Sequence, residues 1–218
     1  MSSPAPQPPE PFNPLGCLPE LPGRAKSLSA SVPDDDACIA LWHKYAMLPN
    51  VQRHSWLVAH IATQLAERVR KNGLDISVDA VRASALLHDI AKTYCLLYGG
   101  SHAQLGAAWV VNETGNHALA QGVAMHVHWP WPLPAGSAIC ALPFLVMYAD
   151  KRVRHDVCVS LEDRFEDLLS RYGGSRATDD GIRASHEQGK LIERALSAQL
   201  GWDLHEASFD SGGLVQRA

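Results

Sequence analysis

The chain has 218 residues, of which 46% are hydrophobic, enough to bury one sizeable core and to predict one domain with or without an extra arm. Its formal charge of −4 provides no overall basic field, so the sequence carries no strong signal for a nucleic-acid partner. The five cysteines lie far apart and form no CxxC pair, which argues against a disulfide scaffold and a cysteine zinc site. Reduced thiols in a cytoplasmic protein are the expectation.

The two ends of the chain differ in composition from its middle. Residues 1–33 hold nine of the fourteen prolines and show almost no apolar periodicity, so we expect a proline-rich extended arm without chemistry. We expect no secretory signal, because the N-terminus lacks a charged region followed by an apolar one. A helical domain is expected at 34–201 and a tail at 202–218.

From residue 34 onward the apolar residues recur at the three- and four-residue spacing that is typical of helices. Pro49 is expected to end the first helix, and His54 to open the second. The apolar stretch at 138–149 is shorter than the roughly 20 residues that cross a bilayer, so we expect a buried helix and no membrane partner. The expected helices cover about 34–48, 55–71, 77–92, 101–114, 116–127, 137–154, 161–172 and 178–200.

No strand pattern of useful length and no repeat of fixed period is present in the sequence. The prediction is therefore an all-α fold, a compact helical bundle. The helix at 161–172 is amphipathic, and we expect it to support the core without contributing a catalytic residue. The tryptophan- and proline-rich segment at 129–136 cannot be helical; it could stack a nucleobase or form an ordinary packed turn.

Asp150 is the first candidate for a functional residue. It follows residues 142–149, which are apolar on every helical face, so its carboxylate is expected to be buried. A buried carboxylate is costly unless a cation, a metal or strong hydrogen-bond donors meet it. The sequence leaves two alternatives open: a metal ligand, or an ion pair with Lys151, Arg152 or a distant arginine.

His88 and Asp89 are adjacent near the end of an expected helix. Neighbouring helical positions diverge by roughly 100°, so both side chains can reach one ion only where it lies beside the helix. A histidine nitrogen with a carboxylate oxygen suits Fe, Mn, Zn, Ni or Co better than Ca. By itself such a pair occurs by chance, and His54 alone would be an ordinary polar residue.

Together, His54, the pair His88-Asp89 and Asp150 resemble the metal-binding residues of the HD superfamily of metal-dependent phosphohydrolases. The resemblance extends over roughly residues 40–172. It implies a bundle of the HD-domain type that binds one or two divalent transition metal ions. Three segments are similar to the family's motifs: His54-Ser55-x-x-Val58-Ala59, Leu86-Leu87-His88-Asp89-Ile90-Ala91-Lys92 and Tyr148-Ala149-Asp150-Lys151-Arg152-Val153.

Two further histidines, His102 and His126, occupy places that complete a second metal site in HD proteins with two ions. The resemblance then implies one ion held by His54, His88, Asp89 and Asp150, and another held by Asp89, His102 and His126. Asp89 would bridge them. His128 lies two residues after His126 and would face away from it on a regular helix, so we expect it to line the pocket or be exposed. We expect the remaining histidines to be ordinary residues: His43, His60, His117, His155, His186 and His205.

The resemblance also implies a reaction. Two close metal ions activate water and neutralise charge on phosphoryl oxygens, which makes Asp89 a catalytic residue. Lys92, about one turn past Asp89, is the best candidate for a second catalytic residue that binds phosphate. Arg152 and Arg154 could add phosphate contacts or be exposed cations at a helix end.

The leading hypothesis is hydrolysis of a phosphate ester or anhydride of a small molecule, with a nucleotide as the expected substrate and partner. Two alternatives remain. Some HD proteins with two irons are oxygenases, which would be recognised by a mixed-valent iron pair and oxygen consumption. A non-catalytic HD domain that senses a ligand would be expected to lack metal ligands, yet the four core residues are present.

Overall fold

A computed structural model describes residues 30–205, 207 and 209 of the chain. The expected arm at 1–33 and tail at 202–218 therefore lie largely outside the described residues. The described part is mainly helical, with almost no strands, which confirms the all-α prediction. Its helices are α1 (Asp35–Lys44), α2 (Pro49–Lys71), α3 (Val78–Leu87), α4 (Lys92–Tyr98), α5 (His102–Thr114), α6 (His117–Met125), α7 (Leu142–Lys151), α8 (Leu161–Tyr172) and α9 (Arg176–Leu200).

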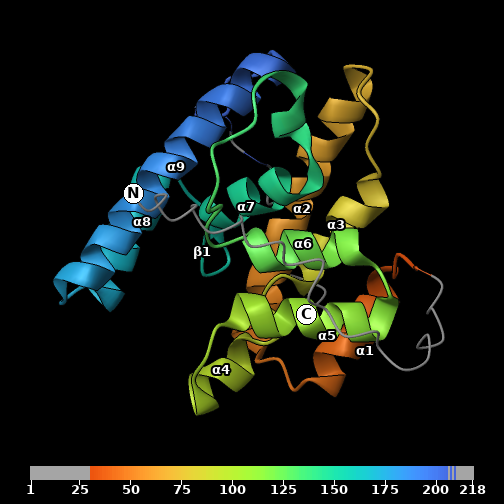
Figure 1. Ribbon diagram of the computed structural model, residues 1–218, viewed down its shortest axis with the longest axis vertical. Coiled ribbons are helices and arrows are strands. Elements are labelled where there is room, and N and C mark those ends of the chain that lie inside the picture. Colours follow the sequence, from red (N-terminus) through yellow and green to blue (C-terminus); the bar gives the residue numbers. More distant parts are fainter. Residues whose placement is uncertain (1–29, 206, 208, 210–218) are drawn as a thin grey trace, which may run out of the picture.

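The long helix α2 lies at the centre of the fold, packed against α3 on one side and α7 on another (Figure 1). Helix α6 packs against α3, α5 and α7, and α8 packs against α9. Apolar side chains from these helices form one continuous buried core. Trp42 of α1 is buried in it, and its indole Nε1–H donates to the Leu86 carbonyl at 2.8 Å, which ties α1 to the end of α3.

Side-chain caps fix where most helices begin. Ser77, Ser101, Asn116 and Ser160 each accept a hydrogen bond from a backbone amide in the first turn of α3, α5, α6 and α8. Helix α5 ends at Gly115, whose φ of 64° lies in the left-handed region that glycine adopts most easily. The caps matter for the site because α3, α5 and α6 carry or precede its histidines.

Helix α2 begins earlier than predicted. Pro49 is its first residue and begins the helix, because the N–H groups of a helix's first turn make no hydrogen bond within the helix and proline loses nothing by lacking one there. His54 therefore lies in the second turn of α2 and is buried, with 6% of its surface exposed. The prediction that His54 opens the helix was wrong.

Helix α3 also ends earlier than predicted. It stops at Leu87, and His88 and Asp89 lie in the turn that joins it to α4, a short helix absent from the prediction. A 3-10 helix, η1 (Gly136–Cys140), precedes α7. The chain after α7 forms a small hairpin of β1 (Val153–Arg154) and β2 (Val157–Cys158). His155 turns this hairpin with a left-handed φ of 59°.

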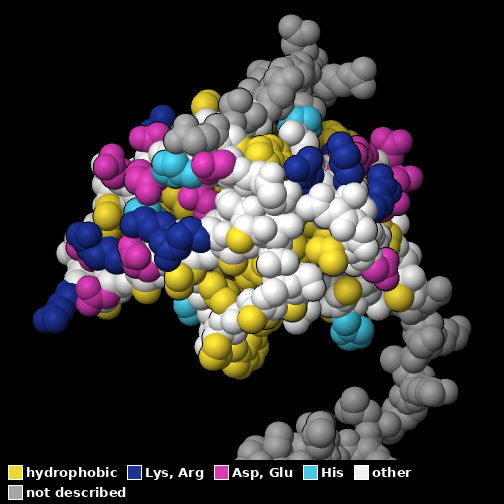
Figure 2. All heavy atoms as spheres, turned by 90° about the horizontal axis from the view of Figure 1, so that it is seen from above, with side chains coloured by type: hydrophobic (Ala, Val, Ile, Leu, Met, Phe, Trp, Pro, Cys, Tyr) yellow, Lys and Arg dark blue, Asp and Glu magenta, His cyan; other side chains and the backbone are white. Residues whose placement is uncertain are grey.

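The face shown in Figure 2 mixes acidic and basic side chains, with hydrophobic side chains between them. No single sign of charge dominates that face, in keeping with the small net charge. Within residues 30–205, no helix has both the length and the apolar composition needed to cross a membrane. The described cysteines, Cys38, Cys95, Cys140 and Cys158, are free thiols.

Candidate metal centre

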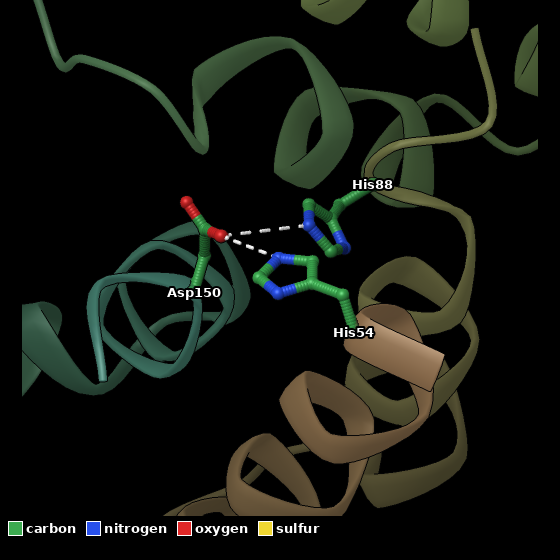
Figure 3. A group of neighbouring side chains, drawn as sticks. All are labelled: His54, His88 and Asp150. Atoms are coloured by element: carbon green, nitrogen blue, oxygen red, sulfur yellow. Dashed lines mark hydrogen bonds and ion pairs between the residues drawn. The ribbon is translucent and has the colours of Figure 1, made fainter. Parts of the chain in front are cut away.

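His54, His88 and Asp150 converge although they are far apart in the sequence (Figure 3). The Asp150 Oδ1 atom lies 2.9 Å from His54 Nε2 and 3.6 Å from His88 Nε2. Lys151 does not take the role of a close ion-pair partner of Asp150, because its amine donates to the carbonyls of His126 and Val127 at 3.3 and 3.0 Å. Packing of α7 against α2 and α3 thus brings a carboxylate to two imidazoles.

Asp89 lies between two groups of histidines, with one carboxylate oxygen facing each. Its Oδ2 atom is 3.4 Å from His88 Nε2 and 3.8 Å from His54 Nε2. Its Oδ1 atom is 3.4 Å from His102 Nε2 and 3.7 Å from His126 Nε2. The two histidines of that second group are 3.2 Å apart at Nε2. The six residues expected to be metal ligands are therefore brought together around one carboxylate.

Backbone carbonyls orient three of the imidazoles. The Nδ1 atoms of His54, His88 and His126 lie 3.0, 2.7 and 2.6 Å from the carbonyl oxygens of residues 155, 85 and 123. A ring that donates its Nδ1–H to a carbonyl presents the Nε2 lone pair on its other side. Metal-binding histidines are commonly held in this way. In all three rings, Nε2 faces the carboxylates.

Two buried atoms in the cluster, His88 Nε2 and Asp89 Oδ1, have no hydrogen-bond partner. Leaving a buried polar atom unpaired costs about 1–3 kcal/mol, so such atoms need an explanation. A divalent cation would satisfy both, and nitrogen with carboxylate oxygen is a donor set suited to transition metals. Two triads have ligand atoms close enough for one ion: His54, His88 and Asp150, and His88, Asp89 and His126.

The electrostatics of the cluster favour a positive charge at its centre. Burial opposes ionisation of Asp89, but Lys92 and His88 hold the pKa of its carboxyl well below the usual range. Burial would lower the pKa of His88, yet the carboxylates of Asp89 and Asp150 raise it to about 10. Burial lowers the pKa of His126 to about 3, which keeps that imidazole neutral. The field of the two carboxylates thus attracts positive charge, and the Nε2 lone pair of the neutral His126 ring is available to a cation.

A cavity of about 670 Å³ opens onto the cluster, a size that suits a small-molecule ligand. Asp89 and Lys92 both line it, and the Lys92 Nζ atom lies 2.7 Å from Asp89 Oδ2. Several cations that the sequence analysis did not predict to bind phosphate also line it: Arg53, Lys151, Arg164 and Arg171. Arg164 and Arg171 are seven residues apart on α8, which places them on one face of that helix. This spacing is the only feature of the sequence that could have indicated a pair of cations acting together.

Some residues considered from the sequence lie elsewhere. Arg152 is buried and its guanidinium donates to the Tyr148 hydroxyl and to the carbonyls of Val159, Leu204 and Ala207, so it holds the chain after α9 and is not placed to bind phosphate. Arg154, on β1, is not among the residues that line the cavity. This is a correction to the expectation of phosphate contacts from Arg152 and Arg154.

The histidine and tryptophan residues next to His126 also lie outside the cavity wall. His128 is exposed, and the wall does not include it. Trp129 packs against Phe144 with ring centroids 4.7 Å apart, and its backbone N–H donates to the side-chain oxygen of Gln188 at 2.9 Å. The segment at 129–136 therefore behaves as a packed turn in the described structure. By contrast, His155 lines the cavity and its carbonyl contacts His54.

Comparison with known proteins gives one match. The family model described as the HD domain matches residues 51–166, which is more than half of the chain and spans the helices from α2 to α8. Neither the curated proteins nor the solved structures contain a match. The HD domain is typical of metal-dependent hydrolases, and the cluster of histidines and aspartates could hold a metal. The chain belongs to the HD-domain family.

Proposed function

We propose that this protein is a metal-dependent phosphohydrolase that cleaves a phosphate ester or anhydride of a small molecule. The observation that carries the proposal is the position of Asp89, whose two oxygens face two separate groups of imidazoles beside a cavity. Membership of the HD-domain family supports hydrolytic chemistry in general. The surplus of cations on the cavity wall supports an anionic substrate.

The proposed ligands divide into two sets that share Asp89. His54, His88, Asp89 and Asp150 would hold one divalent transition metal ion, of Fe, Mn, Ni, Co or Zn. Asp89, His102 and His126 would hold a second. Bound there, such ions supply water activation near neutral pH and neutralise charge on phosphoryl oxygens. The Nδ1 contacts to carbonyls keep the imidazoles in place, which reduces the reorganisation that metal binding requires.

Lys92 is the proposed phosphate-binding residue beside the metal ligands. Its side chain lines the cavity, and its ammonium group lies 2.7 Å from Asp89 Oδ2. It can therefore contact a phosphoryl oxygen of a substrate that lies in the cavity next to Asp89. Asp89 holds the pKa of this amine above its usual value against the lowering effect of burial, which keeps the group charged at neutral pH. A charged donor is what an anionic substrate needs.

A nucleotide is the proposed substrate class. The cavity is large enough for one, and its wall combines cations with apolar side chains such as Phe165 and Tyr172, against which a base can pack. Elemental analysis of anaerobically purified protein would identify the metals. A panel of nucleotides and simple phosphoesters, assayed with those metals, should then release inorganic phosphate or a nucleoside monophosphate. Oxygen consumption without phosphate release would contradict the proposal, and so would the absence of any turnover by metal-loaded protein.

A further inference from the structure

Helix α8 contributes a cationic and apolar wall to the cavity. Arg164, Phe165, Leu168, Arg171 and Tyr172 all line it from this one helix. Arg164 and Arg171 are separated by seven residues, or two helical turns, so both guanidinium groups lie on the side of α8 that faces the cavity. None of these residues belongs to the proposed metal ligands or to Lys92.

The two arginines share a single carboxylate. Arg164 Nη1 lies 3.5 Å from Asp167 Oδ2, and Arg171 Nη2 contacts the same oxygen more closely. Asp167 can neutralise only one of the two positive charges. Its short contact with Arg171 and long contact with Arg164 leave the Arg164 guanidinium without a full partner in the described structure.

Arg164 is nevertheless buried, with 8% of its surface exposed. A buried arginine without a matched anion is costly, so its retention at the cavity wall calls for an anion that it meets in function. Lys151 adds to this surplus of charge. It is 4% exposed, and its amine donates to the carbonyls of His126 and Val127 described above.

We infer that Arg164 and Arg171 form a second anion subsite, which binds a phosphoryl group other than the one that is cleaved. This inference rests on the proposed function, and it names the substrate class: a molecule that carries two or more phosphoryl groups. Guanidinium groups match phosphate oxygens with paired N–H donors, and two of them on one helix face can hold a terminal phosphoryl group against rotation. Asp167 acts as the positioning residue, because it holds Arg171 beside Arg164.

The apolar residues of the same wall complete the subsite. Phe165 and Leu168 follow Arg164 along the cavity side of α8, and Tyr172 follows Arg171. They offer a surface for the carbon part of the substrate next to the arginines. A substrate with a single phosphoryl group at Lys92 would leave the charge of Arg164 unmet.

Binding measurements can test this inference without turnover. The probes are methylenediphosphonate, with two phosphoryl groups that resist hydrolysis, and methylphosphonate, with one. Calorimetric titration of metal-loaded protein should give tighter binding of the diphosphonate. Arg164→Gln and Arg171→Gln should each weaken that binding by about tenfold, the loss of one charge-assisted contact, and weaken methylphosphonate by less than about threefold. Metal content measured after each titration shows whether the diphosphonate has removed the ions.

The matched control is Arg176→Gln, at the start of α9, where the side chain is 96% exposed and lies outside the cavity. It should bind both probes as the wild type does. Equal weakening of both probes in the two α8 variants, or no weakening of either, would overturn the inference. If Arg164→Gln does not fold, Arg171→Gln decides the test. The Arg171 side chain is 36% exposed, so its replacement should leave the fold intact. Failure of the proposed function would be seen separately, as a metal-loaded wild type that binds the diphosphonate but hydrolyses no phosphoester.

Discussion

The Nε2 atom of His102 lies 3.4 Å from Asp89 Oδ1, the carboxylate oxygen that faces away from His54 and His88. His102 is the most exposed of the proposed ligands, with 29% of its side chain accessible, and it comes from the first turn of α5. If it completes a second ion site, His102→Ala should lose one of two metal ions and keep the other. Metal analysis of the purified variant measures this.

The control for that variant is His128→Ala, which removes an exposed imidazole two residues after His126. It should retain the metal content of the wild type. A His102→Ala protein that keeps its full metal content would remove His102 from the proposed ligand set.

Lys92→Met tests the phosphate-binding role. The variant should keep the metal content of the wild type, because a charged lysine ammonium group has no lone pair and cannot be a metal ligand. Turnover should fall by about 10- to 100-fold in kcat/KM, the loss of one charge-assisted hydrogen bond to substrate. Steady-state kinetics beside Lys71→Met, an exposed lysine at the end of α2, checks this. Unchanged kcat/KM in Lys92→Met would make Lys92 a structural partner of Asp89 only.

Arg152→Met should affect stability and not catalysis. The variant leaves the Tyr148 hydroxyl and three carbonyls without their buried donor, and it removes the cation that lies 3.8 Å from Glu193. We expect the free energy of unfolding to fall by about 3 kcal/mol, as measured by urea denaturation, with kcat/KM per folded molecule unchanged. Arg154→Met should change stability by less than about 1 kcal/mol. A selective loss of kcat/KM in Arg152→Met would restore a role in substrate binding.

Gly122→Ala tests how helix packing positions His126. A Cβ at Gly122 would lie 2.2 Å from Ser84 Oγ and 2.5 Å from Leu142 Cδ2, so these two side chains must rotate or α6 must move away from α3 and α7. We expect a loss of about 1–3 kcal/mol in stability and weaker metal binding, since His126 caps the end of α6. Gly181→Ala, where a Cβ meets nothing, should instead stabilise α9 by up to about 1 kcal/mol. Equal thermal stability of the two variants would contradict this account of the packing.

The sequence predicted most of the fold, because the serine and asparagine caps and the apolar spacing act locally. It placed the start of α2 wrongly, since Pro49 is compatible with a first turn as well as with a break. It missed α4, where seven residues are too few to show a period, and the hairpin, whose strands have two residues each. Short elements of this kind depend on tertiary contacts.

The candidate ligands were also accessible from the sequence, because His54, His88, Asp89, His102, His126 and Asp150 fall in family motifs. That they bind metal stays a prediction. The α8 arginines were not identified, because the sequence does not show which helix face meets the cavity. Arg152 was misjudged for the same reason: adjacency to Asp150 in sequence says little about a side chain that turns toward Leu204.

The most direct test of the central claim is the number of metal ions bound by Asp89→Ala, measured by elemental analysis after anaerobic purification, with circular dichroism to verify the fold. Because one oxygen of Asp89 faces each group of histidines, its removal should abolish stoichiometric binding of both ions, while wild-type protein binds about two. A folded Asp89→Ala protein that retains two metal ions would contradict the account.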